Sequence, residues 1–474
     1  MRAIESRAPW FFSVLPVLLA VPFALLISQT RPSTSLLVVA AAIPLVIAFL
    51  SPLTGLFLLV FSMLLGLEFL VGGLGSGTTL GRGLTLRLDD FLLMLVGVGW
   101  LGRVAVSGHE KVFVRTPLNR TIILYMAACI FATLIGILAG RVRPVAGTFF
   151  LLKYYEYFFL FFMTANLVKT MDQVRHLVTA SLVTCALVTL YAIAQIPSGV
   201  RVSAPFEGEF GEPNTLGGYL VFMIALTSGL LVTEGAIRNK WPLVGLLGLA
   251  TIALQATLSR ASFLAAAVVA VIVVCHVSRR NLLLVSGLII GLLVLPLVAP
   301  APVIERVTHT FMQTHQEGQI QIGNVRVDTS TSERLNSWKE SVAVWKKSPI
   351  WGQGVTGGPF MDAMYPRVLS ETGLIGVCAF LALIAALGRS GLTVAIQATD
   401  PYLKGLALGF LFGFIGLLVH AVGANTFIIV RIMEPFWLMA ALITCMYMRG
   451  QTIPNSGDIP TIARQPQTTT GETC

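Results

Sequence analysis

Arginines and carboxylates that stand beside long apolar segments are the residues of this sequence best able to do chemistry. Residues 201–220, RVSAPFEGEFGEPNTLGGYL, place Arg201, Glu207, Glu209, Glu212 and Asn214 at the start of an apolar run. Ionisable residues also lie in or beside other apolar runs: Glu68, Asp89, Asp90, Lys153, Glu156, Arg260, Arg367, Glu371, Arg431 and Glu434. A charge inside a bilayer costs about 2.5–3.5 kcal/mol on the insertion scale, so these residues are expected to face a polar cavity.

The cations of this set are mostly arginines, and this favours a ligand that carries phosphate. A planar guanidinium can make two parallel hydrogen bonds to a phosphate group, whereas a lysine ammonium cannot. A proton relay would instead be rich in carboxylate and histidine near mid-membrane. We expect a pocket for a lipid-linked phosphate or pyrophosphate, with Arg143, Arg201, Arg260 and Arg367 among its ligands. Each arginine taken singly is also explained by contact with lipid headgroups.

The elements that must position these residues are membrane helices. The chain has 474 residues, of which 55% are hydrophobic and 11% charged, and its mean hydropathy is +0.83. Soluble domains are about 25% charged. We predict an all-α, polytopic integral membrane helical bundle of about 12–14 transmembrane helices, because a helix of about 20 apolar residues spans a bilayer. The expected spans lie near residues 11–28, 35–50, 53–72, 90–106, 119–139, 149–167, 176–197, 214–233, 241–257, 261–276, 281–299, 368–388, 402–421 and 426–447.

Loop charges and loop lengths predict the orientation and the division of the chain. The distribution of Lys and Arg favours cytoplasmic N- and C-termini, which places nearly all of the intramembrane charges on the outer side. Residues 1–299 are expected to hold N-terminal transmembrane helices, 300–367 one large outer loop, 368–447 C-terminal transmembrane helices and 448–474 a disordered cytoplasmic tail. Within the loop, SERLNSWKESVAVWKK (332–347) predicts an amphipathic helix that lies on the membrane surface or folds over a cavity.

Shorter patterns give further expectations. The i,i+3 spacing of Lys153 with Glu156, and of Arg431 with Glu434, predicts two ion pairs. His420 is better explained as a hydrogen-bonded buried residue than as a base. The six cysteines have no metal-binding spacing, and His309 and His315 have no carboxylate cluster nearby, so we expect neither a metal nor a cofactor.

Four motifs between residues 201 and 437 carry a resemblance to a known family. An SR pair stands between two apolar helices in TLSRASF, and EPNTLGGYL places proline and asparagine before a small-residue helix. RLNSWKESVAVWKKSPIWGQGVTGG (334–358) runs into a P-x-x-G-x-G turn, and YPRVLSETGLIGVCAF (365–380) contains ETGLIG. In this order the motifs resemble the bacterial O-antigen ligase and O-antigen polymerase (Wzy-type) superfamily.

The resemblance implies a GT-C-like, metal-independent glycosyltransferase on the periplasmic face of the bacterial inner membrane. The donor would be a glycan on undecaprenyl pyrophosphate, held by Arg260, Arg201 and Arg334. The acceptor would be a second lipid-linked repeat unit in a polymerase, or lipid A–core in a ligase. Family ligases carry a histidine–asparagine pair shortly before the ETG glutamate, whereas this chain has Asp362–Ala363 there. Polymerase-like members often have aspartate at that place, which favours a polymerase.

The expected reaction also needs a proton acceptor and contacts to sugar. A direct displacement would invert the anomeric carbon, and the attacking hydroxyl must lose its proton. Candidate bases are Asp362, Glu212, Glu209 and Glu371, although Glu371 also suits a helix N-terminus. The residues expected to contact glycan are Glu209, Asn214, Tyr365 and Trp338. Glu207 is better explained as a solvated loop charge.

Two other classes of protein share some of these features. A lipid-linked oligosaccharide flippase would also need an arginine-rich cavity, but it should show internal repeats and needs no long loop. A non-catalytic scaffold of an export complex would leave the buried arginines unexplained. The expected partners are an undecaprenyl-pyrophosphate-linked glycan and membrane lipid. A chain-length regulator or export complex is a further candidate partner, and nucleic acid is not expected.

Overall fold

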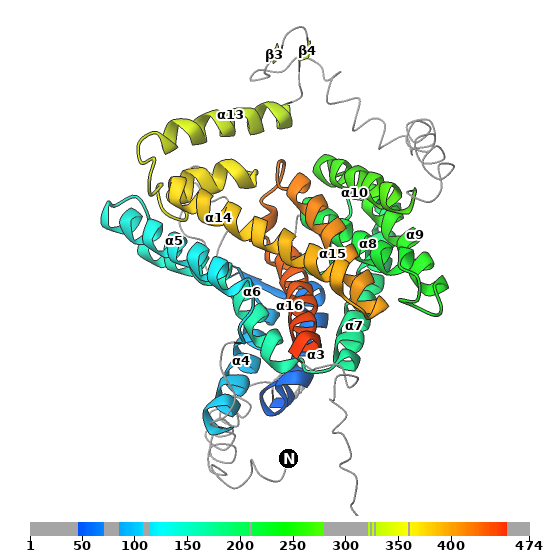
Figure 1. Ribbon diagram of the computed structural model, residues 1–474. Helices are drawn as coiled ribbons and strands as arrows, with labels where there is room; N and C mark the ends of the chain where they lie inside the picture. Colours follow the sequence, from blue (N-terminus) through cyan, green and yellow to red (C-terminus); the bar gives the residue numbers. More distant parts are fainter. Residues whose placement is uncertain are drawn as a thin grey trace, which may run out of the picture.

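The structure, a computed structural model, is a bundle of helices with one helix lying across its end (Figure 1). It describes residues 46–70, 85–107, 114–207, 211–278, 321–322, 325–326, 329–358 and 361–452. The elements in chain order are α3 (Pro52–Leu65), β1 (Glu68–Leu70), β2 (Thr85–Arg87), α4 (Leu88–Ser107), α5 (Asn119–Leu138), α6 (Pro144–Leu167), α7 (Met171–Gln195), η1 (Ile196–Ser198), α8 (Pro213–Val232), α9 (Trp241–Ala256), α10 (Arg260–Ser278), β3 (Gln321–Ile322), β4 (Val325–Arg326), α13 (Thr329–Trp345), α14 (Met364–Gln397), α15 (Pro401–His420), η2 (Thr426–Ile428) and α16 (Val430–Thr452).

The described helices confirm a multi-pass membrane protein. Eight of them are long and apolar enough to cross a membrane, namely α5, α6, α7, α8, α10, α14, α15 and α16, and α3 and α9 are shorter apolar helices. Each predicted span from residue 53 to 276 and from 368 to 447 coincides with a helix. The spans predicted near 11–28 and 281–299, and most of 35–50, lie outside the described residues.

Several predicted boundaries are wrong by a few residues. The span predicted near 53–72 ends at Leu65, because the chain then turns at Gly66 into an antiparallel hairpin that pairs Glu68 with Arg87. α14 begins at Met364 and continues to Gln397, so it starts before residue 368 and extends past 388. α16 continues to Thr452, beyond the predicted start of a disordered tail at 448, and residues 453–474 lie outside the described part.

The turns on one side of the bundle are connected to each other and to the segment after α13. We call this side the α13 face. Arg141, in the α5–α6 turn, donates from Nη1 to Gln353 Oε1 at 3.0 Å. The amide of Met364 donates to Ala421 O, after α15, at 3.1 Å. Arg260 and Arg431 lie at the starts of α10 and α16, whereas Lys153 and Glu156 lie in the middle of α6. The orientation of the bundle in the membrane stays a prediction.

Glycines allow the central helices α8 and α15 to touch along their backbones. A Cβ atom added at Gly229 of α8 would lie 2.1 Å from the backbone nitrogen of Gly409 in α15. A Cβ at Gly409 would in turn lie 2.6 Å from Leu226 O. Small residues favour this close approach in membrane bundles, where packing takes the place of the hydrophobic driving force between helices. α16 completes the centre, with Phe436 and Trp437 buried among aromatic rings of α6, α8 and α15.

A break inside α14 explains two of the sequence motifs. Gly373, in ETG, has φ 62° and ψ −164°, so the helix bends there. The break removes the helical hydrogen bonds from residue 374 to 370 and from 375 to 371. The P-x-x-G-x-G turn replaces them with four backbone bonds: Gln353 N to Ser370 O at 2.9 Å, Gly354 N to Glu371 O at 2.8 Å, Leu374 N to Pro349 O at 2.9 Å and Ile375 N to Ile350 O at 3.3 Å.

Glycine is required on both sides of this contact. Gly352 has φ 74°, and a Cβ there would lie 2.5 Å from the backbone of Glu371. A Cβ at Gly373 would lie 2.4 Å from Ile350 O. Positive φ and close backbone approach are the two conditions that glycine alone meets without strain. The turn at 349–354 therefore forms one unit with the bent start of α14.

Candidate functional site

The loop before α8 and the SR turn before α10 form a single hydrogen-bonded unit on the α13 face. Arg201 Nε donates to Thr257 O at 2.9 Å, and Val202 N donates to Ala256 O at 3.4 Å. Ser259 Oγ donates to Asn214 Oδ1 at 2.8 Å. These bonds bring together two motifs that lie about 50 residues apart in the sequence, as separations of 45 and 56 residues show.

The SR turn is tight and strained. Leu258 has φ 50°, a left-handed conformation that bulky residues rarely adopt. Thr257 and Ser259 are buried on either side of it, and Ser259 N donates to Thr257 Oγ1 at 3.3 Å. Arg260 follows as the first residue of α10 and is half-buried. Strain of this kind persists only where the surrounding structure enforces it, and it is concentrated at functional sites.

Two cations and two helix N-termini thus meet at this unit. Arg201 donates a hydrogen bond to Thr257 O in the SR turn, and Arg260 directly follows that turn. Both arginine side chains are half-buried. α8 begins at Pro213 and α10 begins at Arg260. The N-terminus of a helix carries a partial positive charge and unpaired N–H groups, so it favours an anion. Of the five predicted pyrophosphate ligands, the structure brings Arg201 and Arg260 together.

The other three predicted pyrophosphate ligands belong to other elements. Arg143 is exposed at the start of α6. Arg367 is buried and its Nε donates to Glu371 Oε1 at 3.0 Å. Arg334 lies on α13, and its side chain is outside the described part of the structure. Arg367 is therefore engaged in an ion pair within α14.

The four predicted bases differ in their surroundings. Glu371 accepts from Arg367 and from Thr356 N at 3.3 Å, so its carboxylate helps to hold the turn after α13. Glu212 is half-buried and accepts from Thr215 Oγ1 at 2.8 Å at the start of α8. Asp362 is half-buried, with Asn425 Nδ2 at 3.5 Å from its Oδ1. Glu209 lies outside the described residues.

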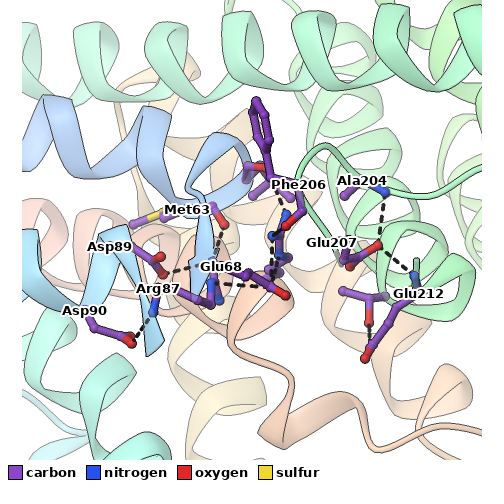
Figure 2. A network of polar contacts seen from close by, with 12 residues as sticks. Met63, Glu68, Arg87, Asp89, Asp90, Ala204, Phe206, Glu207 and Glu212 are labelled. Atoms are coloured by element: carbon purple, nitrogen blue, oxygen red, sulfur yellow. Dashed lines mark hydrogen bonds and ion pairs between the residues drawn. The ribbon is translucent and has the colours of Figure 1, made fainter. Parts of the chain in front are cut away.

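Glu207 is not the solvated loop charge that was predicted. It is 8% exposed, and one carboxyl oxygen, Oε2, accepts from Ala204 N at 3.1 Å and from Glu212 N at 2.9 Å (Figure 2). The loop folds around the side chain because these two amides need an acceptor. Burial raises the pKa of Glu207 to about 8, although the nearby Arg431 guanidinium acts to lower it.

Arg431 connects the loop before α8 to the α3–α4 hairpin, and all five N–H groups of its guanidinium take part. It is 3% exposed. Its guanidinium makes five hydrogen bonds: Nε to Glu68 Oε1 at 3.2 Å, Nη2 to Glu68 Oε1 at 2.9 Å, Nη1 to Leu64 O at 3.0 Å, Nη1 to Pro205 O at 2.9 Å and Nη2 to Phe206 O at 3.2 Å. A guanidinium has five N–H groups, so Arg431 is saturated. The predicted pair with Glu434 is wrong, because tertiary packing supplies Glu68 instead.

A second group of charges lies beside Arg431, between the α3–α4 hairpin, α6 and α16. Arg87 Nη2 is 2.8 Å from Asp89 Oδ2 and 3.9 Å from Glu434 Oε2, and it donates to Met63 O at 2.6 Å (Figure 2). The predicted pair of Lys153 and Glu156 is confirmed at 3.4 Å. Lys153 also contacts Asp90 at 2.5 Å. These charges are paired with one another at the edge of the 201–215 loop.

A buried chain of side chains leads away from the SR turn. Ser262 Oγ donates to Ser259 Oγ at 2.8 Å and lies 3.1 Å from His420 Nε2, and His420 Nδ1 lies 2.8 Å from Thr426 Oγ1. His420 has no exposed surface, and both ring nitrogens have partners, as predicted for a hydrogen-bonded residue. Next to Thr426, Asn425 donates to Met361 O at 2.6 Å, which brings Asp362 to the same end of α15.

Sequence reasoning missed Ser262, Thr426 and Asn425 as members of this site. The only local signal is the spacing of Ser259 and Ser262, which places both hydroxyls on one side of the first turn of α10. Of the predicted glycan contacts, Tyr365 donates to Leu418 O at 2.6 Å and is half-buried. Trp338 lies on α13 and is 36% exposed. Within the described ranges, no group of histidine, cysteine and carboxylate side chains has an arrangement that could hold a metal.

Comparison with known proteins supports the resemblance drawn from the motifs. Residues 245–381 match the family model described as O-antigen ligase (Wzy_C). The match covers less than a third of the chain, from α9 through the SR turn, α13 and the 349–354 turn into α14. Among curated proteins, no sequence matches the chain. The match is consistent with the O-antigen ligase/polymerase superfamily and with an activity of the ligase or polymerase type.

Proposed function

We propose that the protein is a polysaccharide polymerase that joins undecaprenyl-pyrophosphate-linked oligosaccharide repeats on the periplasmic face of the bacterial inner membrane. The observation that carries the proposal is the union of Arg201, Arg260 and the N-termini of α8 and α10 in one hydrogen-bonded unit. That arrangement suits a pyrophosphate. Asp362, where family ligases carry histidine, favours polymerase over ligase.

The proposed chemistry is one direct displacement that inverts the anomeric carbon. A hydroxyl of the acceptor glycan attacks C1 of the donor sugar, and the bond from C1 to the pyrophosphate oxygen breaks. Arg201 and Arg260 stabilise the negative charge that develops on the leaving pyrophosphate, which preorganised donors do well in a site that excludes water. Asp362 or Glu212 accepts the proton of the hydroxyl. No step requires a metal.

Substitution of the two arginines tests the site. Loss of one preorganised donor to a developing anion costs about 10²–10³-fold in kcat. We expect Arg260→Ala and Arg201→Ala to lower transfer by that order. Arg238→Ala is the matched control, because Arg238 is exposed in the α8–α9 turn at the other end of the same helices. Full activity of a folded Arg260→Ala protein would show that the site lies elsewhere.

A reaction with defined substrates tests the function. Purified protein is incubated with a polyprenyl-pyrophosphate oligosaccharide alone, and the products are separated by glycan size. A ladder of longer lipid-linked products supports a polymerase. The description of the matched family makes a ligase the second candidate, and transfer only after addition of lipid A–core would establish it. Absence of transfer in both reactions, with movement of the substrate across liposomes, would show a flippase.

A further inference from the structure

Buried hydrogen bonds link Thr426, through His420, Ser262 and Ser259, to Asn214. The hydroxyl protons determine which side chain is the donor and which is the acceptor at each contact of this hydrogen-bonded chain. Ser259 donates its proton to Asn214 Oδ1, and Ser262 donates its proton to Ser259 Oγ. A serine hydroxyl has only one proton, so at its contact with His420 Nε2 Ser262 must accept. His420 therefore carries a proton on Nε2, and in the neutral ring Nδ1 accepts from Thr426 Oγ1. Every donor in the chain points toward Asn214.

We infer that His420 is a positioning residue that, through Ser262 and Ser259, turns the amide of Asn214 so that its N–H groups face the ligand. The inference rests on the proposed function for the identity of that ligand. Because the chain occupies Oδ1, the group that Asn214 presents is its NH₂, which is a donor only. A donor at the first turn of α8 suits phosphate oxygens, which are acceptors only. Asn214 is thus a pyrophosphate ligand rather than a contact for sugar hydroxyls.

Close packing against the start of α8 holds the side chains of Ser262 and His420 in place. A Cβ added at Gly217 would lie 2.1 Å from Ser262 Oγ, and one at Gly218 would lie 2.9 Å from His420 Cε1. The start of α8 therefore rests directly on the chain, and neither the serine nor the ring can move without displacing α8. Aligned hydrogen bonds in a buried setting polarise one another, so each donor is stronger than it would be alone.

The tautomer of His420 tests the direction of the chain without any substrate. The protein has six histidines, and the spectrum of ¹⁵N-histidine-labelled protein can be assigned to His420 by comparison with His420→Gln. We expect the neutral ring to be protonated on Nε2. A ring protonated on Nδ1 would reverse every donor in the chain, turn Asn214 Oδ1 toward the ligand and overturn the inference.

Binding of a short polyprenyl pyrophosphate, with inorganic pyrophosphate as a second probe, tests the role of the amide. We expect Asn214→Asp to weaken binding at least tenfold, because aspartate has no N–H to donate and adds a negative charge. His420→Phe, which cannot hydrogen-bond, should also weaken it about tenfold. His420→Gln can donate to Ser262 and accept from Thr426, so it should restore most of the affinity. Ser228→Ala, which removes a buried hydroxyl bonded only within α8 (to Ile224 O at 2.7 Å), is the control.

The outcomes separate this inference from the proposed function. Unchanged affinity in a folded Asn214→Asp protein, with normal binding by the unaltered protein, overturns the inference and leaves the transferase proposal standing. Failure of the unaltered protein to bind either probe overturns the proposed function and the ligand assigned to Asn214, while the tautomer still decides the direction of the chain. Equal loss in His420→Phe and His420→Gln would show that the ring matters for packing alone and would also overturn the positioning role.

Discussion

Removal of Arg431 should be among the most damaging single changes in the described part of the chain. The side chain is 3% exposed, and its five hydrogen bonds end on three backbone carbonyls and one carboxylate. Breaking a buried ion pair by removing one partner costs about 3–5 kcal/mol. Each carbonyl left buried without a donor adds about 1–3 kcal/mol unless water replaces the lost group. We therefore expect Arg431→Met to lower the free energy of unfolding by at least about 3–5 kcal/mol.

Graded variants distinguish the ion pair from the carbonyl contacts. Arg431→Lys keeps the charge opposite Glu68 but cannot reach all three carbonyls, so we expect a loss of about 1–3 kcal/mol. Unfolding is followed in detergent micelles for Arg431→Met, Glu68→Gln and the double variant, which gives the coupling energy of the pair. The control is Arg175→Met, because Arg175 is half exposed and lies 3.5 Å from Asp400 in a surface pair worth at most about 1 kcal/mol. A lysine variant as stable as the unaltered protein, or additive single variants, would refute this reasoning.

Two further predictions concern the loop carboxyl and the glycine contact. The pKa of Glu207 is raised from 4.5 to about 8, so the folded protein binds this proton more tightly than the unfolded chain. The resulting stability is complete below pH 4.5 and is lost as the pH rises through about 8, by about 1.4 kcal/mol per pH unit. Glu207→Gln should flatten the fall in unfolding free energy measured between pH 5 and 9, and an unchanged slope would count against a buried acid. Gly229→Ala should destabilise the protein by about 1–3 kcal/mol in the same unfolding assay, because its Cβ would lie 2.1 Å from the backbone of Gly409. Gly245→Ala, whose Cβ would meet no atom within 4 Å, should be neutral or slightly stabilising, and equal losses in the two variants would exclude the backbone contact as the cause.

The helices could be predicted from sequence because apolar length alone determines what can span a bilayer. The pair of Lys153 and Glu156 could also be predicted, since a helix brings residues three apart together whatever surrounds it. The same rule failed for Arg431, because its partner Glu68 is 363 residues away in sequence and is brought near only by packing of the hairpin against α16. Local spacing contains no information on such choices.

The candidate site was predictable only in part, for a similar reason. The SR pair and the proline–asparagine pair were singled out by residue type, and the structure joins them through Ser259 and Asn214. The burial of Glu207 was missed, because a glutamate followed by Gly208, with two further glutamates close behind it, has the composition of an exposed loop. Two backbone amides turned inward make it a buried acceptor, and backbone direction cannot be read from side-chain chemistry.

The contact between the 349–354 turn and the break at Gly373 has a consequence for biogenesis. Each unpaired backbone N–H or C=O group that enters lipid raises the free energy of insertion, so a broken helix is unfavourable on its own. Here the amides of residues 374 and 375 and the carbonyls of 370 and 371 find partners in the turn. The turn is synthesised before α14, so its donors and acceptors are already present when the broken helix leaves the ribosome. The order of the two motifs along the chain thus allows α14 to be inserted with its gap already closed, and the reverse order would leave the break open during insertion.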